Sequence, residues 1–598
     1  MNGYNSKMLL LISALSCLPA TASYAACNCE SSDVANPCTG KSISVTVNAT
    51  TINGTKSANA TFNWAFNSNG GDARCGQFAN GDYWIAPAAG QSTVTVTGIT
   101  TTSPGSISAD ENPVPEKRGL LNNSKNYGNY DAAENIITHL PISYSTNTSL
   151  VAAIQRNEGI EGNCGTSAIV GECVDAYHVV TVLTAVPESA GATVIRPNIT
   201  GSNKVLLSLS DFDFTKIPTY SFLTGADSGG YEAMRQRWSH SVEFFSLNYF
   251  DGSTWKSYSE AGRAFRSHIV VDDYGAGMGR QLHDDLAIIM SSANTLPQKQ
   301  KAIAAILSYG LDIYMVKFND RGAAYNWSSG AGQHLGKFTP AVFFAAMAKS
   351  NTYANNLKTF AGLDYPAQPQ ELAQVHVGPY GPVWGDFQEG IKRYWNDMVW
   401  ANCYDNAPGP CDPNVGQKTE ADPYMLIDGP ADKPGTTYFP IGYAGILNFS
   451  AVMALMPSFA AIVNTSKPVD FVIRARTHGL KTWPDPCVTV DTRLNRATCN
   501  IYTGGLTCDY YFLNPSAIEK TWGPKSITDA TQGCVTTEVA GHTQQGRFRS
   551  MDGATAPINM GYASGQLYNH WDTIIANWSM PGTSLQPPVL FKLQVSDD

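Results

Sequence analysis

The sequence of 598 residues has little charge, and the charge that it has is not basic. Charged side chains make up only 15% of it, and 39 lysines and arginines stand against 49 aspartates and glutamates. A protein that binds nucleic acid needs a basic face to displace counterions from the phosphates. The composition therefore argues against a nucleic-acid partner.

Long apolar runs are missing beyond the N-terminus. No later stretch reaches the roughly 20 apolar residues that a membrane helix needs, so we expect no integral membrane segment. The N-terminus itself has Lys7, then the apolar run 8–15, then small residues up to Ala26, which is the order of a secretory signal. We therefore expect residues 1–25 to be a signal peptide and the mature protein to be secreted or periplasmic. A lipoprotein anchored through Cys17 or Cys27 is the alternative, but neither cysteine follows the usual leucine and small residues.

Zinc-type cysteine pairs are also absent, because no C-x-x-C pair meets a second one at zinc spacing. Loss of Cys17 with the signal would leave twelve of the 13 cysteines. An even number of cysteines in an exported protein indicates disulfides, although their connectivity cannot be read from the sequence. We expect no cofactor, and the sequence leaves open whether the protein binds a structural calcium ion.

Two kinds of periodicity divide the chain. Between about residues 41 and 209 the pattern alternates with period two, most clearly at 42–48, 92–97 and 179–186, and polar turns separate the runs. Beyond about Ala226 the period is helical, as in 298–316, and a second helix is expected to begin at Pro340 with Thr339 as its cap. Further helices are expected at 387–400, 443–455, 469–478 and 565–578, and long polar loops with cysteines at 403–437 and 485–545. This predicts an α+β multidomain protein, with a β-sandwich at 26–225 and a helical α/α-toroid-like domain at 226–598.

The densest group of reactive side chains lies in a glycine-rich stretch between two expected helices. It contains Arg321, Tyr325, Asn326, Trp327, His334 and Lys337. Glycines would let the backbone approach a ligand closely, whereas a tight interhelical turn with polar decoration is the plainer interpretation.

Two further groups are candidates. One contains His376, Tyr380 and Trp384, although a tryptophan here could equally be a packing residue. The other begins at Arg263 and includes the acid pairs 272–273 and 284–285, which could act as acid and base or simply as caps and ion-pair partners. The segment from Arg263 to Lys337 contains eight basic and six acidic residues, and its small positive net charge suits an anionic substrate.

Two stretches carry a resemblance to known proteins. Gly76 to Trp84, and Asn326-Trp327 through His334 to Pro340, resemble secreted bacterial proteins with a β domain and an α/α-toroid, and more distantly the toroidal polysaccharide lyases. The resemblance implies β-elimination on an anionic polysaccharide or oligosaccharide that contains a uronic acid. Asn326 would then neutralise the substrate carboxylate, His334 would remove the C5 proton and Tyr380 would act as base or acid. The substrate-binding residues would be Arg321, Tyr325, Trp327, Lys337, His376, Trp384 and Arg263.

Two other functions remain open. An inverting glycoside hydrolase would need two carboxyl groups roughly 6.5–9.5 Å apart, for which Asp272, Asp285, Asp386 and Glu389 are the candidates. The third possibility is a glycan-binding surface protein without catalytic activity.

Overall fold

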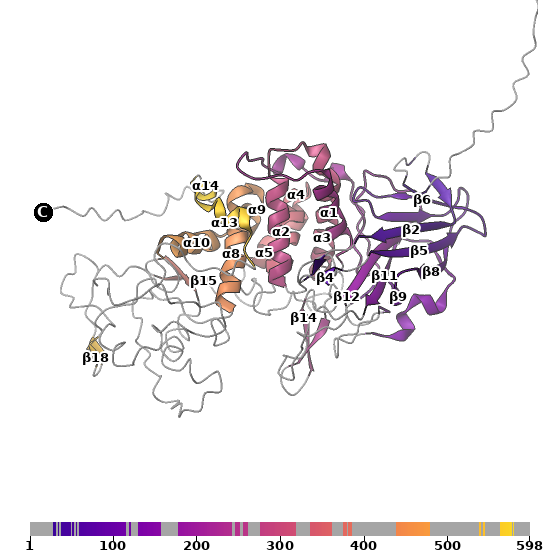
Figure 1. Ribbon diagram of the computed structural model, residues 1–598, viewed down its shortest axis with the longest axis horizontal. Coiled ribbons are helices and arrows are strands. Elements are labelled where there is room, and N and C mark those ends of the chain that lie inside the picture. The colour runs from indigo at the N-terminus through magenta and orange to yellow at the C-terminus, as the bar shows by residue number, and fades with distance from the viewer. Residues whose placement is uncertain are drawn as a thin grey trace, which may run out of the picture.

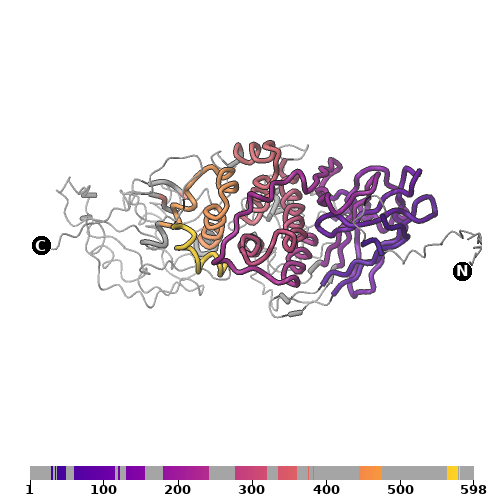
Figure 2. Tube along the Cα trace, turned by 90° about the horizontal axis from the view of Figure 1, so that it is seen from above, coloured from indigo at the N-terminus to yellow at the C-terminus, as the bar shows by residue number. Residues whose placement is uncertain are grey.

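The computed structural model describes residues 28–30, 34, 37–48, 51–52, 55–56, 59–114, 119–120, 130–156, 177–241, 246–250, 255–260, 275–318, 335–361, 375–378, 381–384, 438–478, 538–539, 542–543, 562–576 and 578. Within these residues the chain is an α+β protein, in which two sheets come first and helices follow (Figure 1). Both views show the sheets at one end, helices α1–α4 in the middle and the later helices beyond them (Figure 2).

The larger sheet has six strands in the order β1 (Cys38–Gly40), β6 (Ala73–Gln77), β7 (Tyr83–Ala86), β12 (Tyr177–Ala185), β11 (Thr148–Arg156) and β9 (Ser106–Glu111). Strands β7 and β12 are parallel, and the other neighbours are antiparallel. The smaller sheet is antiparallel and has the order β10 (Ile142–Tyr144), β8 (Val94–Thr101), β5 (Ala60–Asn67) and β2 (Ser42–Val47). Four separate two-stranded hairpins are β3 (Thr51–Ile52) with β4 (Thr55–Lys56), β13 (Ser246–Phe250) with β14 (Trp255–Glu260), β15 (Val375–Gly378) with β16 (Gly381–Trp384), and β17 (Glu538–Val539) with β18 (His542–Thr543).

The two sheets bury a common apolar core. Along β2 and β5 every second side chain is buried, as the alternation in the sequence predicts. Phe62 and Trp64 of the smaller sheet belong to the same buried cluster as Ile85 and Leu183 of the larger one. Because the residues of one face share this core, a slip of one residue in register would expose it to water. The strands expected at 42–48, 92–97 and 179–186 are confirmed as β2, β8 and β12.

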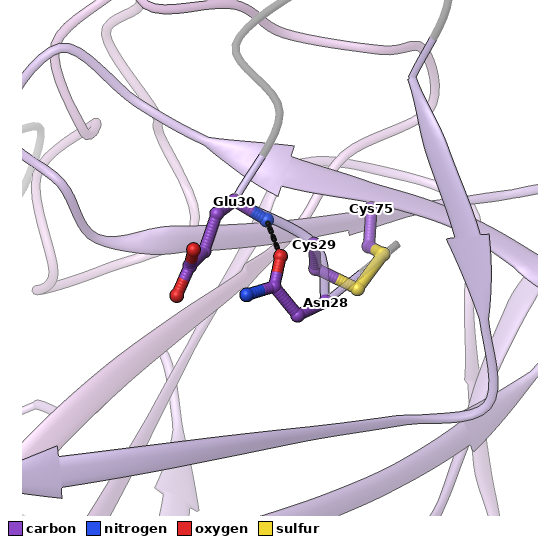
Figure 3. The surroundings of a disulfide bond; sticks show 4 residues. All are labelled: Asn28, Cys29, Glu30 and Cys75. Atoms are coloured by element: carbon purple, nitrogen blue, oxygen red, sulfur yellow. Dashed lines mark hydrogen bonds between the residues drawn. A yellow bond between two sulfur atoms is a disulfide. The ribbon is translucent and has the colours of Figure 1, made fainter. Parts of the chain in front are cut away.

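A disulfide fixes the segment that precedes β1 to the larger sheet. Cys29 is bonded to Cys75 of β6, across 46 residues of sequence (Figure 3). Asn28 accepts a hydrogen bond from the backbone N–H of Glu30 through its side chain, which shapes the turn around Cys29. Cys38, which is opposite Cys75 in the strand register, is disulfide-bonded as well. The prediction of disulfides is therefore confirmed for the described part of the chain.

The helices are α1 (Ser228–Ser239), α2 (Gly275–Ile289), α3 (Leu296–Phe318), α4 (Leu335–Met347), α5 (Asn351–Ala361), α8 (Tyr438–Leu455), α9 (Pro457–Val463), α10 (Lys467–His478), α13 (Gly565–Asn569) and α14 (Trp571–Ile575). Short 3-10 helices are η1 (Ala132–Glu134), η2 (Ile136–His139), η3 (Leu209–Asp211) and η4 (Phe214–Lys216). Helix α3 is central, since every residue from 302 to 316 is buried and it packs against both α1 and α4. None of the described helices is both long and apolar enough to cross a membrane.

Helix α4 begins earlier than the sequence suggested. It starts at Leu335 and contains Pro340 in its interior, so the expected cap at Thr339 is wrong. A proline inside a helix costs about 3 kcal/mol. The extra turn buries Leu335 and Phe338, each worth roughly 1.5–3 kcal/mol, so the burial offsets the proline. Gly310 of α3 makes the crossing possible, because a Cβ there would meet the carbonyl oxygen of Pro340 and lie 2.7 Å from Cβ of Phe344.

The other expected helices agree with the structure where residues are described. Those at 443–455 and 469–478 are α8 and α10, and the one expected at 565–578 is divided at His570 into α13 and α14. The expected helix at 387–400, the long loops at 403–437 and 485–545, and residues 1–25 are outside the described residues, apart from β17 and β18. The boundary drawn at 225 falls between the end of β12 and the start of α1.

Candidate functional site

Most of the side chains predicted to do chemistry lie outside the described residues. This applies to Arg263, Arg321, Tyr325, Asn326, Trp327, His334 and Tyr380. For His376 and Trp384 the structure describes the backbone only: His376 pairs with Val383, and Trp384 pairs with Val375 in the β15–β16 hairpin. Of the residues predicted for the lyase site, Lys337 is the one whose side chain is described.

Lys337 lies in the first turn of α4 and has no accessible surface. Lysine is rarely buried so completely unless its amine is paired. Its role in substrate binding remains a prediction.

Helix α4 and the β15–β16 hairpin are the described elements next to the two main predicted segments. Each is connected by packing to the N-terminal half of α8. Helix α4 begins at Leu335, directly after His334, and Cδ1 of Leu335 would lie 3.3 Å from a Cβ on Gly445 of α8. The β15–β16 hairpin, whose two strands flank Tyr380 in the sequence, packs on α10. Helix α10 packs in turn on α8, where the rings of Phe471 and Tyr443 meet edge to face with centroids 5.9 Å apart.

Three consecutive residues of α2, His283, Asp284 and Asp285, have separate environments. A helix turns by about 100° per residue, so neighbours in sequence point in different directions. The fully buried His283 has Nε2 3.1 Å from Oγ1 of Thr339 in α4. Burial lowers the pKa of His283 to about 3, so the imidazole is neutral at neutral pH.

Asp285 is buried, and both of its carboxylate oxygens accept hydrogen bonds. Its Oδ2 accepts hydrogen bonds from Arg237 at 2.6 Å and from Nε1 of Trp238 at 2.7 Å, and Gln281 donates to Oδ1 at 3.3 Å. Burial raises the pKa of Asp285 against the opposing effect of Arg237. The carboxylate therefore joins α1 to α2, which is one of the structural roles that the sequence left open for it.

Asp284 is the member of this trio that keeps some access to solvent. Its side chain is 23% exposed and lies 3.7 Å from Arg280, one turn earlier on α2. Burial raises the pKa of Asp284, while Ser564, at the start of α13, and Arg280 act in the opposite direction. A partly accessible carboxyl with a raised pKa is a common feature of functional sites, and of structural ion pairs too.

A buried charge network that the sequence did not reveal links the larger sheet to α3. Arg196 is fully buried, and its Nε donates to Oδ2 of Asp82 at 2.8 Å. Its Nη1 and Nη2 donate to the two carboxylate oxygens of Asp312 on α3, at 3.2 and 2.7 Å. Burial raises the pKa of Asp82 to about 6, although Arg196 and Arg235 act against the rise.

These partners are more than 110 residues apart in the chain, so no local motif connects them. One feature of the sequence could have indicated the network. Asp312 interrupts an otherwise apolar helical run, and a carboxylate at such a position needs a buried partner. Which residue is that partner depends on the fold and not on the neighbouring sequence.

Neither a metal centre nor a related protein identifies the chain. Among the described residues, no group of three or more His, Cys, Asp and Glu side chains is placed to hold a metal ion. Comparison with family models, with curated proteins and with solved structures found no match, so the function has to be inferred from the side chains of this chain itself.

Proposed function

We propose that this chain is an exported polysaccharide lyase, which cleaves a uronic-acid-containing glycan by β-elimination. The single observation that supports it best is the common anchoring of the two predicted segments. Leu335, the neighbour of His334 in the sequence, packs beside Gly445 of α8. The hairpin whose strands flank Tyr380 in the sequence packs on α10, and α10 packs on the same part of α8. Gly445 and Tyr443 are two residues apart and so point about 200° apart around α8. The described neighbours of the two segments therefore lie on different sides of the same stretch of α8, and a groove shared by the two segments would have to cross that stretch.

In this proposal the two sheets form a β-sandwich and the helices belong to an α/α-toroid. Such an arrangement would give the catalytic residues a rigid helical support, on which sites are held more accurately than on free loops. The disulfide between Cys29 and Cys75 fits an oxidising compartment, and it supports a secreted or periplasmic location.

The chemistry assigned to each residue follows from the reaction. Neutralising the substrate carboxylate, the role of Asn326, makes the C5 proton more acidic. His334 removes that proton, the electron pair forms the C4–C5 double bond, and the C4–O4 bond breaks. Tyr380 gives a proton to the departing O4, and proton transfers of this kind are each worth roughly 10² to 10⁴ in rate.

The hydrolase alternative is weaker than the sequence suggested. Asp285, one of its four candidate carboxylates, is buried and bonded to Arg237 and Trp238. The other three, Asp272, Asp386 and Glu389, lie outside the described residues. A carboxylate with no access to solvent cannot protonate a glycosidic oxygen or activate water.

The proposal is tested with a panel of uronic-acid polymers. The wild-type protein should release products that absorb in the ultraviolet, because elimination leaves a conjugated unsaturated uronate. His334→Ala and Tyr380→Phe should lower kcat/KM by about 10² or more, whereas the control variant Asp285→Asn should change stability rather than the rate of the folded enzyme. Tight glycan binding without product, unchanged in His334→Ala and Tyr380→Phe, would instead support the glycan-binding protein.

A further inference from the structure

A small cavity lies where the two sheets meet helix α1. Its volume is about 90 Å³, and it is partly open to solvent. The polar residues in its lining include Asp82, Thr181, Arg235, Gln77 and Tyr83. A water molecule takes up about 30 Å³ in the liquid, so the cavity has room for about three water-sized groups.

One buried hydroxyl at this cavity has no hydrogen-bond partner, and a buried carboxylate lies beside it. Thr181 of β12 is completely buried, and its Oγ1 has no hydrogen-bond partner. Asp82 is 2% exposed, and the hydrogen bonds described for its carboxylate, from Asn80 and Arg196, are both to Oδ2. Leaving a buried polar group unpaired costs about 1–3 kcal/mol, so a ligand that satisfies these atoms would gain from binding.

Arg235 of α1 supplies positive charge at the same cavity. The guanidinium is held by Glu232, at 2.8 Å from Nε to Oε2, and Nη1 donates to the carbonyl oxygen of Asn80 at 3.2 Å. Gly81 makes this position possible, because it has a φ of +85° and a Cβ there would lie 2.7 Å from Nη1 of Arg235. The turn between β6 and β7 therefore has the arginine directly over it.

The combination of charges limits the ligand. Asp82 is paired with Arg196, and Arg235 is paired with Glu232, so the charges at the cavity are already balanced within the protein and favour neither an anion nor a cation. A hydroxyl group both donates and accepts, so it can satisfy a carboxylate oxygen, a threonine hydroxyl and a guanidinium together. The ring of Tyr83, which also lines the cavity, offers an apolar face for carbon atoms.

We propose that this cavity binds a neutral ligand with vicinal hydroxyl groups, either a free polyol of glycerol size or the terminal edge of a sugar. The site is independent of the proposed lyase groove, since none of its lining residues belongs to the predicted catalytic set. It would act as a second point of contact for a glycan or a small osmolyte.

The chain offers a matched pair of variants for the test. Thr181 and Thr184 are both on β12, both are fully buried, and both have an unpartnered Oγ1, but only Thr181 lines the cavity. Replacement of either by valine removes an unsatisfied hydroxyl while keeping the shape, so both variants should fold with thermal midpoints at or above that of the wild type.

Binding is measured by ligand-observed NMR on the full chain, with glycerol and the methyl glycosides of neutral hexoses as probes and acetate and methylammonium as charged controls. The wild type and Thr184→Val should bind a neutral probe equally, and Thr181→Val should bind it about two- to tenfold more weakly. Binding of glycerol alone indicates a polyol site, and binding of the glycosides as well indicates a sugar site. The proposal is overturned if no neutral probe binds, if acetate or methylammonium binds better, or if the two valine variants behave alike.

Discussion

Replacing Arg196 with methionine should destabilise the protein strongly at pH 8 and less at pH 5. The guanidinium makes three hydrogen bonds of 2.7–3.2 Å to the carboxylates of Asp82 and Asp312. Methionine fills similar space but leaves these acids without their common partner. Removing one member of a buried ion pair costs about 3–5 kcal/mol, and we expect a loss in this range at pH 8.

The pH dependence follows from Asp82, whose pKa is raised to about 6 by burial. At pH 5 this carboxyl is mostly protonated, so the loss of Arg196 leaves less uncompensated charge and the cost is smaller. The assay is urea unfolding followed by tryptophan fluorescence at both pH values, with disulfides intact. Arg280→Met is the matched control, because Arg280 is 38% exposed and lies 3.7 Å from its aspartate, and it should cost less than about 1 kcal/mol.

A rescue variant separates lost charge pairing from lost packing. If the destabilisation comes from unpaired carboxylates, Arg196→Met combined with Asp82→Asn and Asp312→Asn should recover most of the stability, because neutral amides need no counter-charge. A loss below about 1 kcal/mol at pH 8, or the same loss at both pH values, would refute this account of the network.

Three further predictions concern single positions. Asp82→Asn should flatten part of the pH dependence of stability: the wild-type carboxyl has a pKa of about 6 rather than 3.8, so its contribution is largest at low pH and falls as the pH rises from 4 to 6, and the difference between the two urea curves should follow that window. Gly310→Ala should lower the unfolding free energy by about 1–3 kcal/mol, because its Cβ would meet Pro340 and Phe344, whereas Gly565→Ala, which has open space around it, should not; equal melts would contradict the helix crossing. Cys29→Ser should cost roughly 4 kcal/mol, the loop entropy for 46 residues, and an unchanged urea midpoint would argue against the Cys29–Cys75 bond.

Much of the secondary structure could be predicted because it depends on the local spacing of apolar residues. The alternation at 42–48 makes one face of β2 apolar, and a sheet can bury such a face whatever its partners are. The apolar run that became α3 was equally clear, although nearly all of it is buried rather than one stripe. The start of α4 was missed because local capping rules gave Thr339 and Pro340 more weight than the burial of Leu335 and Phe338.

The parts that could not be predicted depend on contacts between distant residues. No local pattern in the sequence marks Arg196, yet it is fully buried and links Asp82 to Asp312. The cavity beside Thr181 requires β2, β7, β12 and α1 to meet, and no single stretch of sequence contains that information. The proposed catalytic residues remain predictions, and what the structure adds is the anchoring of their neighbours on α8.

The proposed reaction is tested most directly by cleaving a uronic-acid polymer in water enriched with heavy oxygen. Elimination breaks the C4–O4 bond without consuming water. Mass spectrometry at reaction times short compared with exchange of the reducing-end oxygen should therefore find unsaturated products that contain no heavy oxygen from the solvent. Heavy oxygen at the newly formed chain end, together with saturated products, would show hydrolysis and contradict the proposal.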